Sequence, residues 1–233
     1  MIRFINFLLF LKLMRKDKKS LKDQIKVVVL DGSHNKHGMT QKLIKGFLEG
    51  IRSIDRRGNI KVEIIDLLDR DIGFCRGCNS CTSDKDPINA RCTIDDDCIK
   101  IKRKALDSDV LVFASPIYEY SVSSGMKRFL ERCLTLATFR FGIAARAGPI
   151  KGKHGVILCP CGAPFPFNHL MGITWHPHLI LKKMCKMFRC SKIHVLFAGG
   201  MAANKKTEQK YCKKAYDIGV NIGSKLGPKR KRD

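Results

Sequence analysis

The segment KVVVLDGSHNKHGMT, residues 26–40, carries the pattern that decides the fold. Val27 to Leu30 is a continuous apolar run followed by Asp-Gly, which is typical of a parallel strand covered on both faces. Apolar residues then recur at helical spacing from Leu43 to Ile51. A buried strand, a glycine-flanked loop and an amphipathic helix in this order predict the first unit of an α/β domain.

The same alternation continues along the chain. Further strands are predicted by apolar runs at residues 60–67, 109–116, 154–162 and 192–200. Helical spacing of apolar residues follows three of them, at residues 126–134, at 178–188 and from about residue 206 onward. Five strands with helices between them predict an α/β fold with an open, doubly wound parallel sheet and right-handed crossovers.

The length of 233 residues favours one domain with one substantial core. We expect this domain to span residues 25–226, preceded by a basic extension over 1–24 and followed by a basic tail over 227–233. The extension contains an apolar run from Ile5 to Leu11, which is shorter than the roughly 20 residues that cross a bilayer. It also lacks a small-residue cleavage site, so we expect a cytoplasmic protein with no transmembrane segment, whose extension packs on the domain or on a partner. Attachment of the extension to a membrane surface is the alternative.

The formal net charge of +24 is unusual for a chain of this size. The basic residues are spread along the sequence and do not alternate with aromatic residues, as a stacking platform for nucleic acid would require. This positive charge has three possible interpretations: a solvated basic surface, a surface for an acidic redox partner, or a nucleic-acid-binding surface. The distribution favours the first reading over nucleic-acid binding.

The loop that leaves the first strand, GSHNKHGMT at residues 32–40, has the features of a phosphate cradle. Glycines permit close approach, hydroxyl groups can donate hydrogen bonds, and the following helix directs its N-terminal N–H groups towards the loop. The loop is not a Walker motif, because no Gly-Lys-Ser/Thr closes it. An ordinary strand-to-helix turn with a polar cap is the alternative.

The loop that leaves the third strand begins SPIYEYSVSS, at residue 115. Pro116 stiffens the exit from the strand, and Ile117, Tyr118 and Tyr120 place flat apolar surface at the edge of the sheet. Such surface suits a planar heteroaromatic ligand. Exposed tyrosines at a subunit interface are the alternative. Because ligands of open α/β sheets bind at the carboxyl ends of the strands, both loops belong to the candidate site.

The segment FCRGCNSC places Cys75, Cys78 and Cys81 at intervals of three, and Cys92 follows. Without a signal peptide, the thiols are expected to be reduced or metal-bound. Four close thiolates can hold a 4Fe-4S cluster, although zinc and free thiols remain alternatives. Cys98 is a further candidate ligand, whereas the cysteines on apolar helical stretches are expected to be buried in the core.

The first loop together with CRGCNSC, CTIDDD and ASPIYEYSVSSGMKRFLERC resembles the NAD(P)H-dependent FMN reductases of flavodoxin-like fold, in particular the iron-sulfur flavoproteins. This resemblance, which is strongest over residues 25–135, implies the strand order 2-1-3-4-5 with a cysteine-rich insertion at residues 73–98 after strand 2. It also implies the metal ligands Cys75, Cys78, Cys81 and Cys92. The fourth cysteine in that family follows the third after about five to seven residues, whereas the spacer TSDKDPINAR has ten.

The resemblance implies FMN bound across the carboxyl edge of the sheet. By position, the phosphate would lie among Ser33, Asn35, Gly38, Met39 and Thr40, and the isoalloxazine among Pro116, Ile117, Tyr118 and Tyr120, with Gly162 on its other side. The family commonly has Arg where Asn35 stands and Asn where Met39 stands. Neutral Asn35 would weaken phosphate binding unless Lys36 or a histidine compensates.

These residues predict flavin-mediated redox chemistry. No Ser-His-Asp order or paired-carboxylate motif falls on the candidate loops, so no catalytic acid, base or nucleophile is expected and the chemistry would be the cofactor's. An enzyme would oxidise NAD(P)H, and an electron carrier would take electrons from an acidic ferredoxin-like donor. A cluster-free flavin or quinone reductase is one alternative and a basic nucleic-acid-binding protein is another. The resemblance also implies a homodimer or homotetramer.

Overall fold

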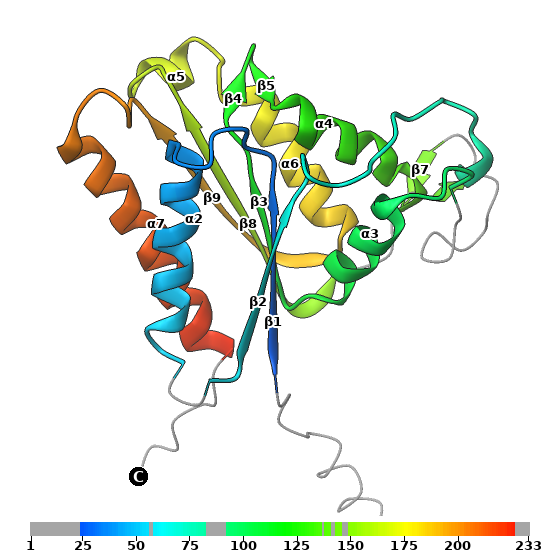
Figure 1. Cartoon of the computed structure of the whole chain (residues 1–233), viewed down its shortest axis with the longest axis horizontal. Helices are drawn as coiled ribbons and strands as arrows, with labels where there is room; N and C mark the ends of the chain where they lie inside the picture. The colour runs from blue at the N-terminus through cyan, green and yellow to red at the C-terminus, as the bar shows by residue number, and fades with distance from the viewer. Residues whose placement is uncertain are drawn as a thin grey trace, which may run out of the picture.

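The computed structural model describes residues 24–55, 58–82, 92–136, 138–140, 143–145 and 149–226. Its centre is a five-stranded sheet of β1 (Ile25–Asp31), β2 (Ile60–Asp66), β3 (Val110–Ala114), β8 (Ile150–Cys161) and β9 (Cys190–Gly199), in the order β2-β1-β3-β8-β9 (Figure 1). All four neighbouring pairs are parallel. The predicted α/β class and strand order are therefore confirmed.

Helices cover both faces of this sheet. On one face lie α2 (Met39–Arg52) and α7 (Lys205–Leu226), and on the other lie α3 (Asp97–Asp107), α4 (Ser124–Glu131) and α6 (Trp175–Met187) (Figure 1). Successive residues of β1 alternate between the two cores, with Val27 and Val29 towards α2 and Val28 and Leu30 towards α4. This two-sided burial explains why the central strands β1 and β3 contain uninterrupted apolar runs.

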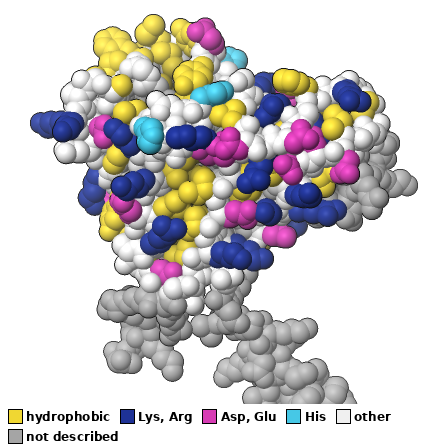
Figure 2. Space-filling model, viewed as in Figure 1, with side chains coloured by type: hydrophobic (Ala, Val, Ile, Leu, Met, Phe, Trp, Pro, Cys, Tyr) yellow, Lys and Arg dark blue, Asp and Glu magenta, His cyan; other side chains and the backbone are white. Residues whose placement is uncertain are grey.

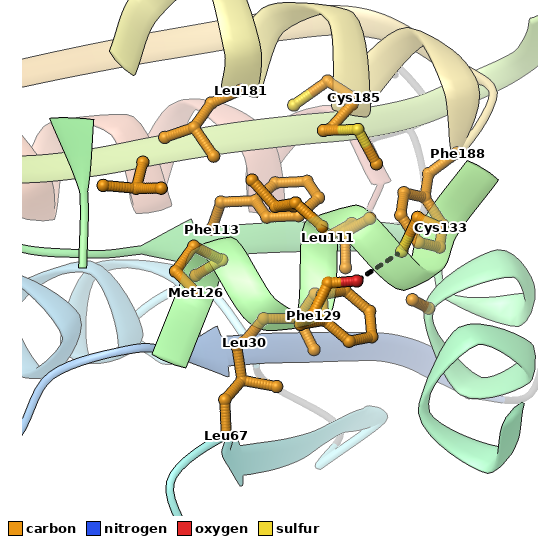
Figure 3. Close-up of a cluster of buried hydrophobic side chains, with 14 of the residues drawn as sticks. Leu30, Leu67, Leu111, Phe113, Met126, Phe129, Cys133, Leu181, Cys185 and Phe188 are labelled. Atoms are coloured by element: carbon orange, nitrogen blue, oxygen red, sulfur yellow. Dashed lines mark hydrogen bonds between the residues drawn. The ribbon is translucent and has the colours of Figure 1, made fainter. Parts of the chain in front are cut away.

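The core beneath α4 and α6 is built largely from aromatic and aliphatic side chains. Phe188 packs against Phe113 and Phe129, with ring centroids 5.9 Å and 6.3 Å apart (Figure 3). Cys133 and Cys185 are fully buried in the same core. The expectation that the cysteines on or beside helical stretches are buried is confirmed for Cys133, Cys185 and Cys190, whereas Cys212 of α7 is only partly buried.

The opposite face is held by an unusually close contact between α2 and α7. An added Cβ at Gly50 would lie 2.0 Å from the carbonyl oxygen of Tyr216, and one at Gly219 would lie 2.3 Å from that of Phe47. The two helix backbones therefore touch where a side chain would otherwise separate them. No other residue type fits at either position without moving a helix.

Short elements at the edges of the sheet were not anticipated from periodicity. They are the hairpins β4 (Ile117–Tyr118) with β5 (Ser121–Val122) and β6 (Thr138–Arg140) with β7 (Ile143–Ala145), the four-residue helix α5 (Phe167–Leu170), and the 3-10 turns η1 (Ser80–Thr82) and η2 (Arg132–Leu136). They are too short to show a repeating apolar pattern.

The predicted extension over 1–24 and the tail over 227–233 lie outside the described residues, apart from Gln24. Within the described part of the chain, no helix combines the length and the hydropathy that crossing a bilayer demands.

Candidate functional site

The loops that leave β1, β3 and β8 meet at the carboxyl edge of the sheet, at the top of Figure 1. The backbone N–H of Gly32 donates to the carbonyl of Ala114 at 2.9 Å, and the Ser123 hydroxyl donates to the carbonyl of Gly32 at 2.5 Å. The N–H of Ser115 donates to the carbonyl of Leu158 at 3.1 Å. The loops after β1 and β3 are thus bonded to each other, and the β3 loop is anchored on strand β8.

Only a glycine fits at position 32, where the first loop contacts the start of α4. A Cβ at this position would lie 2.8 Å from both Met126 Cβ and Ser123 Oγ. Ser123 is fully buried, caps the N-terminus of α4, and accepts a hydrogen bond from the Ser115 hydroxyl at 3.3 Å. The sequence pattern marks the glycines of this loop, but it does not identify Ser123 as the link between the loops.

The buried carboxylate of Asp31 organises the start of the first loop. Its Oδ1 atom accepts hydrogen bonds from the backbone N–H and the hydroxyl of Ser33, at 2.9 Å and 2.7 Å. Gln41 Nε2 donates to Asp31 Oδ2 and to Ser33 Oγ, the latter at 3.0 Å. The hydroxyl of Ser33 therefore points into the loop, and it would have to rotate to donate to a ligand.

Asn35 and Lys36 are also engaged within the chain. Asn35 Oδ1 accepts from the N–H of His37 at 2.9 Å, and its carbonyl accepts from Gly38 at 3.0 Å. Lys36 forms an ion pair with Asp66 at the end of β2. Gly38 is the N-cap of α2 and supplies no side-chain hydrogen bond. The first N–H groups of the helix, at Met39 and Thr40, are thus the donors best placed to receive an anion.

Tyr118 and Tyr120 lie on the β4–β5 hairpin, and each is about half exposed, at 54% and 49%. The two residues of the hairpin loop, Glu119 and Tyr120, have φ of 43° and 58°, a left-handed conformation that glycine usually adopts. Such backbone strain in ordinary residues concentrates at functional sites. By contrast, Pro116 and Ile117 are buried beneath the hairpin.

The loop after β8 is stabilised by Asn168 of α5. Asn168 Nδ2 donates to Cys161 Sγ at 3.7 Å, and Asn168 Oδ1 is buried without a hydrogen-bond partner. Burial raises the pKa of Cys161, so this thiol is a poor nucleophile. A Cβ at Gly162 would meet no atom within 4 Å, which leaves open space at that point of the edge.

Around this edge, large apolar side chains face outward. Figure 2 shows them gathered at the top of the molecule, where Figure 1 places α5 and the β4–β5 hairpin. They are Tyr118, Tyr120, Phe165, Phe167, Leu170, Met171 and Trp175. Apolar surface of this kind marks a ligand or protein contact.

The chain leaving β2 runs towards the side of the molecule where α3 and β7 lie (Figure 1). Cys75, Cys78, Cys81 and Cys92 line one pocket there, together with Arg76, Gly77, Asn79, Thr93, Ile94 and Leu134. Like-charge interactions with the other three thiols contribute to raising the pKa of Cys81, after the larger effect of burial. Hydrogen bonds from Ser80 and Thr93 lower the pKa of Cys78 to about 7.

The four thiols share this pocket but do not converge on a point. Within the described residues, which leave out most of the spacer at 83–91, no three His, Cys, Asp or Glu side chains are placed to hold a metal ion. The donor type nevertheless fits a soft metal or an iron-sulfur cluster, because interacting thiols become thiolates when a cation neutralises them. Cys98 is fully buried and does not line the pocket, and burial raises its pKa to about 11.

A buried ion pair joins the two ends of the cysteine segment, which we define as residues 73–94. Arg132 Nη1 donates to the carbonyl of Gly73 at 2.8 Å, and Nη2 donates to the carbonyl of Ile94 at 3.2 Å. The same guanidinium binds Asp96 through both nitrogens, at 2.5 Å and 3.1 Å. Asp96 also accepts from the N–H of Gly73 at 2.9 Å and caps α3. The sequence pattern indicates neither this role of Asp96 nor its pairing with Arg132.

Three comparisons with known proteins bear on this site. The family model for NADPH-dependent FMN reductase matches residues 25–165. An iron-sulfur flavoprotein of Archaeoglobus fulgidus is 27% identical over 143 residues, which is 60% of this chain and 57% of that protein. One of Methanocaldococcus jannaschii is 32% identical over 108 residues, 46% of this chain and 51% of that protein. The chain thus matches little more than half the length of these relatives.

Solved structures share the fold over most of the chain. The NAD(P)H:quinone oxidoreductase of Methanothermobacter marburgensis gives a TM-score of 0.67 at 15% identity, covering 85% of this chain and 97% of that one. The FMN-dependent NADH-azoreductase of Bacillus anthracis, solved with FMN, gives a TM-score of 0.68 at 14% identity, covering 86% and 100%. The flavodoxin-like architecture expected from the sequence is therefore shared with these proteins.

Proposed function

Because the chain belongs to the NADPH-dependent FMN reductase family, we propose that it is an FMN-dependent NAD(P)H oxidoreductase, passing electrons to a small-molecule or protein acceptor. The observation that carries the proposal is the joining of the β1 and β3 loops through Gly32 and Ser123, beside strand β8, to which Ser115 is bonded. When bound, FMN supplies hydride acceptance and single-electron transfer.

The residues of the chain would bind and orient this cofactor. The N–H groups at the start of α2, from Met39 and Thr40, would receive the phosphate, with Ser33 and Asn35 completing the loop and Gly38 allowing close approach. Tyr118 and Tyr120 would flank the isoalloxazine above buried Pro116 and Ile117. The open space at Gly162 would admit the other edge of the ring. Apolar surface at this edge would exclude water.

We further propose a 4Fe-4S cluster on Cys75, Cys78, Cys81 and Cys92, with electrons passing from the NAD(P)H site or a ferredoxin-like donor. The shared pocket and the interaction of the four thiols support this assignment. All eleven cysteines are free thiols, which accords with a reducing, cytoplasmic location. The cluster would add single-electron transfer to the chemistry of the flavin.

The absorbance spectrum of protein purified without oxygen tests both assignments. We expect resolved flavin bands in the blue and near ultraviolet, together with a broad brown shoulder that dithionite bleaches. Cys78→Ser should remove the shoulder and keep the flavin bands, whereas Cys212→Ser, at a half-buried thiol of α7, should keep both. Protein that remains colourless after addition of FMN would contradict the flavin assignment, and a shoulder that survives Cys78→Ser would contradict the ligand set.

A cluster-free NAD(P)H-dependent flavin or quinone reductase is the second candidate. It is favoured by the lack of metal-binding convergence among the described side chains. The test is to treat the protein with iron and sulfide without oxygen. If the treated protein oxidises NAD(P)H and shows flavin bands without the brown shoulder, the second candidate is supported. Steeply salt-dependent DNA binding by colourless protein would instead indicate a basic nucleic-acid-binding protein.

The phosphate loop makes a specific prediction at Asn35. Asn35→Asp keeps the side-chain oxygen that accepts from His37 but adds a negative charge beside the expected phosphate. We expect FMN affinity to fall about tenfold, which corresponds to about 1.4 kcal/mol. Affinity for riboflavin, which lacks the phosphate, should be unchanged when both ligands are titrated by flavin fluorescence. An equal loss for both ligands would show that Asn35 acts only on the shape of the loop.

Partner proteins are the remaining part of the proposal. The exposed apolar side chains around α5 support a homodimer or homotetramer, and exposed Lys182, Lys183 and Lys186 on α6 support an acidic redox partner. Light scattering should therefore give a mass of at least two 26.4 kDa chains. A monomer at micromolar concentration would contradict the homo-oligomer.

A further inference from the structure

Two buried thiols face each other where α6 ends and β9 begins. Cys185 lies in the last turns of α6, and Cys190 is the first residue of β9. Between them Arg189 reverses the chain with φ of 65°. The two side chains are 0% and 4% exposed, and their thiols share a hydrogen bond. Figure 3 shows Cys185 next to Phe188 in the core beneath α6.

Gly155 of β8 gives these two sulfur atoms their space. An added Cβ at Gly155 would lie 2.9 Å from Cys185 Sγ and 3.2 Å from Cys190 Sγ. Both sulfurs therefore face the same point of the sheet, where only a glycine leaves room for them. The two cysteines lie on α6 and β9, which follow one another in the chain, and Gly155 lies on β8, the strand that pairs with β9.

A buried lysine supplies positive charge beside the pair. Lys153 is 2% exposed, and its Nζ donates to the carbonyls of Ala105 and Leu106 at the end of α3, both at 2.7 Å. Burial lowers the pKa of Lys153 to about 8, and its charge interacts with Cys190. The hydrogen bond from Cys185 and the charge of Lys153 lower the pKa of Cys190, whereas that hydrogen bond and burial raise the pKa of Cys185.

We propose that Cys185 and Cys190 form an oxidation-sensitive dithiol, converted to a disulfide by hydrogen peroxide. The Cys190 thiolate attacks one peroxide oxygen, the O–O bond breaks, and Cys190 sulfenic acid and hydroxide form. The Cys185 sulfur then attacks the Cys190 sulfur, and the sulfenic oxygen leaves as water with the thiol proton. Two thiols are oxidised to one disulfide, and one peroxide is reduced. Neither step involves the flavin loops or the cysteine segment.

The full-length protein allows a direct test, because trypsin separates the two cysteines. Cleavage after Lys183, Lys186, Arg189 and Lys192 yields Met-Cys-Lys, residues 184–186, and Cys-Ser-Lys, residues 190–192. After treatment with hydrogen peroxide, unfolding in iodoacetamide and digestion, mass spectrometry should find these two peptides joined. The joined mass is that of the two peptides less two hydrogen atoms. Untreated protein should give both peptides alkylated.

Two variants give the matched controls. Cys185→Ser should abolish the joined peptide and leave a sulfenic acid at Cys190 that dimedone traps. Cys133 is fully buried in the same core, and its thiol donates a hydrogen bond to the Phe129 carbonyl at 3.3 Å. Cys133→Ser should leave the joined peptide unchanged. Separate alkylation of Cys185 and Cys190 after prolonged excess peroxide would overturn the proposal, as would oxidation of Cys190 in wild type without linkage. Mapping of the wild type decides the matter even if Cys185→Ser fails to fold.

Discussion

Replacing Arg132 with methionine is expected to lower the free energy of unfolding by about 3–5 kcal/mol. Arg132 and Asp96 are 1% and 3% exposed at their side chains. Removing the guanidinium leaves the Asp96 carboxylate buried without its counter-ion, and the carbonyls of Gly73 and Ile94 lose their donor. Because methionine keeps much of the volume, the loss reports the interactions more than a cavity. Urea unfolding followed by circular dichroism measures it.

The neighbouring helix supplies the matched control. Lys127 and Glu131 of α4 form an exposed ion pair at 3.1 Å, and Lys127→Met should cost about 0–1 kcal/mol. A loss of similar size in both variants would contradict the role assigned to Arg132. Removing one partner of an ion pair greatly lowers stability only when the remaining charge is buried.

The ion pair also gives the Arg132→Met effect a pH dependence. Burial alone would raise the pKa of Asp96, but hydrogen bonds from Arg132, Gly73 and Cys98 hold that pKa below its ordinary value. A carboxyl with a depressed folded pKa stabilises the protein above its unfolded pKa and loses this contribution as the pH falls through the folded pKa. The difference between wild type and Arg132→Met should therefore shrink in acid.

The second large effect is expected at Gly50. Alanine normally stabilises a helix by about 1 kcal/mol relative to glycine. At Gly50 the added methyl group would lie 2.0 Å from the carbonyl oxygen of Tyr216, a backbone atom that side-chain rotation cannot move. We expect Gly50→Ala to lower the free energy of unfolding by about 3 kcal/mol. In a denaturant titration, the midpoint of unfolding should occur at a lower denaturant concentration than in the wild type.

A substitution on the exposed face of α7 is the control for this contact. Asn221 is exposed on α7, and Asn221→Ala should raise stability by about 0.5 kcal/mol through helix propensity. The two alanine substitutions should thus have opposite signs. A stabilising Gly50→Ala would show that α2 and α7 are farther apart in solution.

The fold could be predicted from the sequence because burial leaves a direct trace in the pattern of residues. Val27 to Leu30 lie between two layers of helices, so every position of the strand is apolar and the run is unmistakable. The helices α2 and α6 show their buried stripes for the same reason. The hairpin of Tyr118 and Ser121 leaves no such trace, because its strands have two residues each.

The candidate site could be predicted in its location but not in its internal bonds. Asp-Gly at the end of the first strand and Ser-Pro at the end of the third identify the edge where the loops meet. The pairing of Arg132 with Asp96 joins residues 36 apart, and a local pattern carries no signal for it. An arginine among the buried apolar residues of FLERCL was the one available hint.

The guanidinium of Arg132 has a consequence for the length of the cysteine segment. Since Gly73 and Ile94 bind the same side chain, Arg132 holds the two ends of the segment together. The entropic cost of closing a flexible loop grows only with the logarithm of its length, so four residues added between ends held in this way should cost less than about 0.5 kcal/mol. Inserting or deleting a few residues between Cys81 and Cys92 should therefore change the stability of the sheet very little.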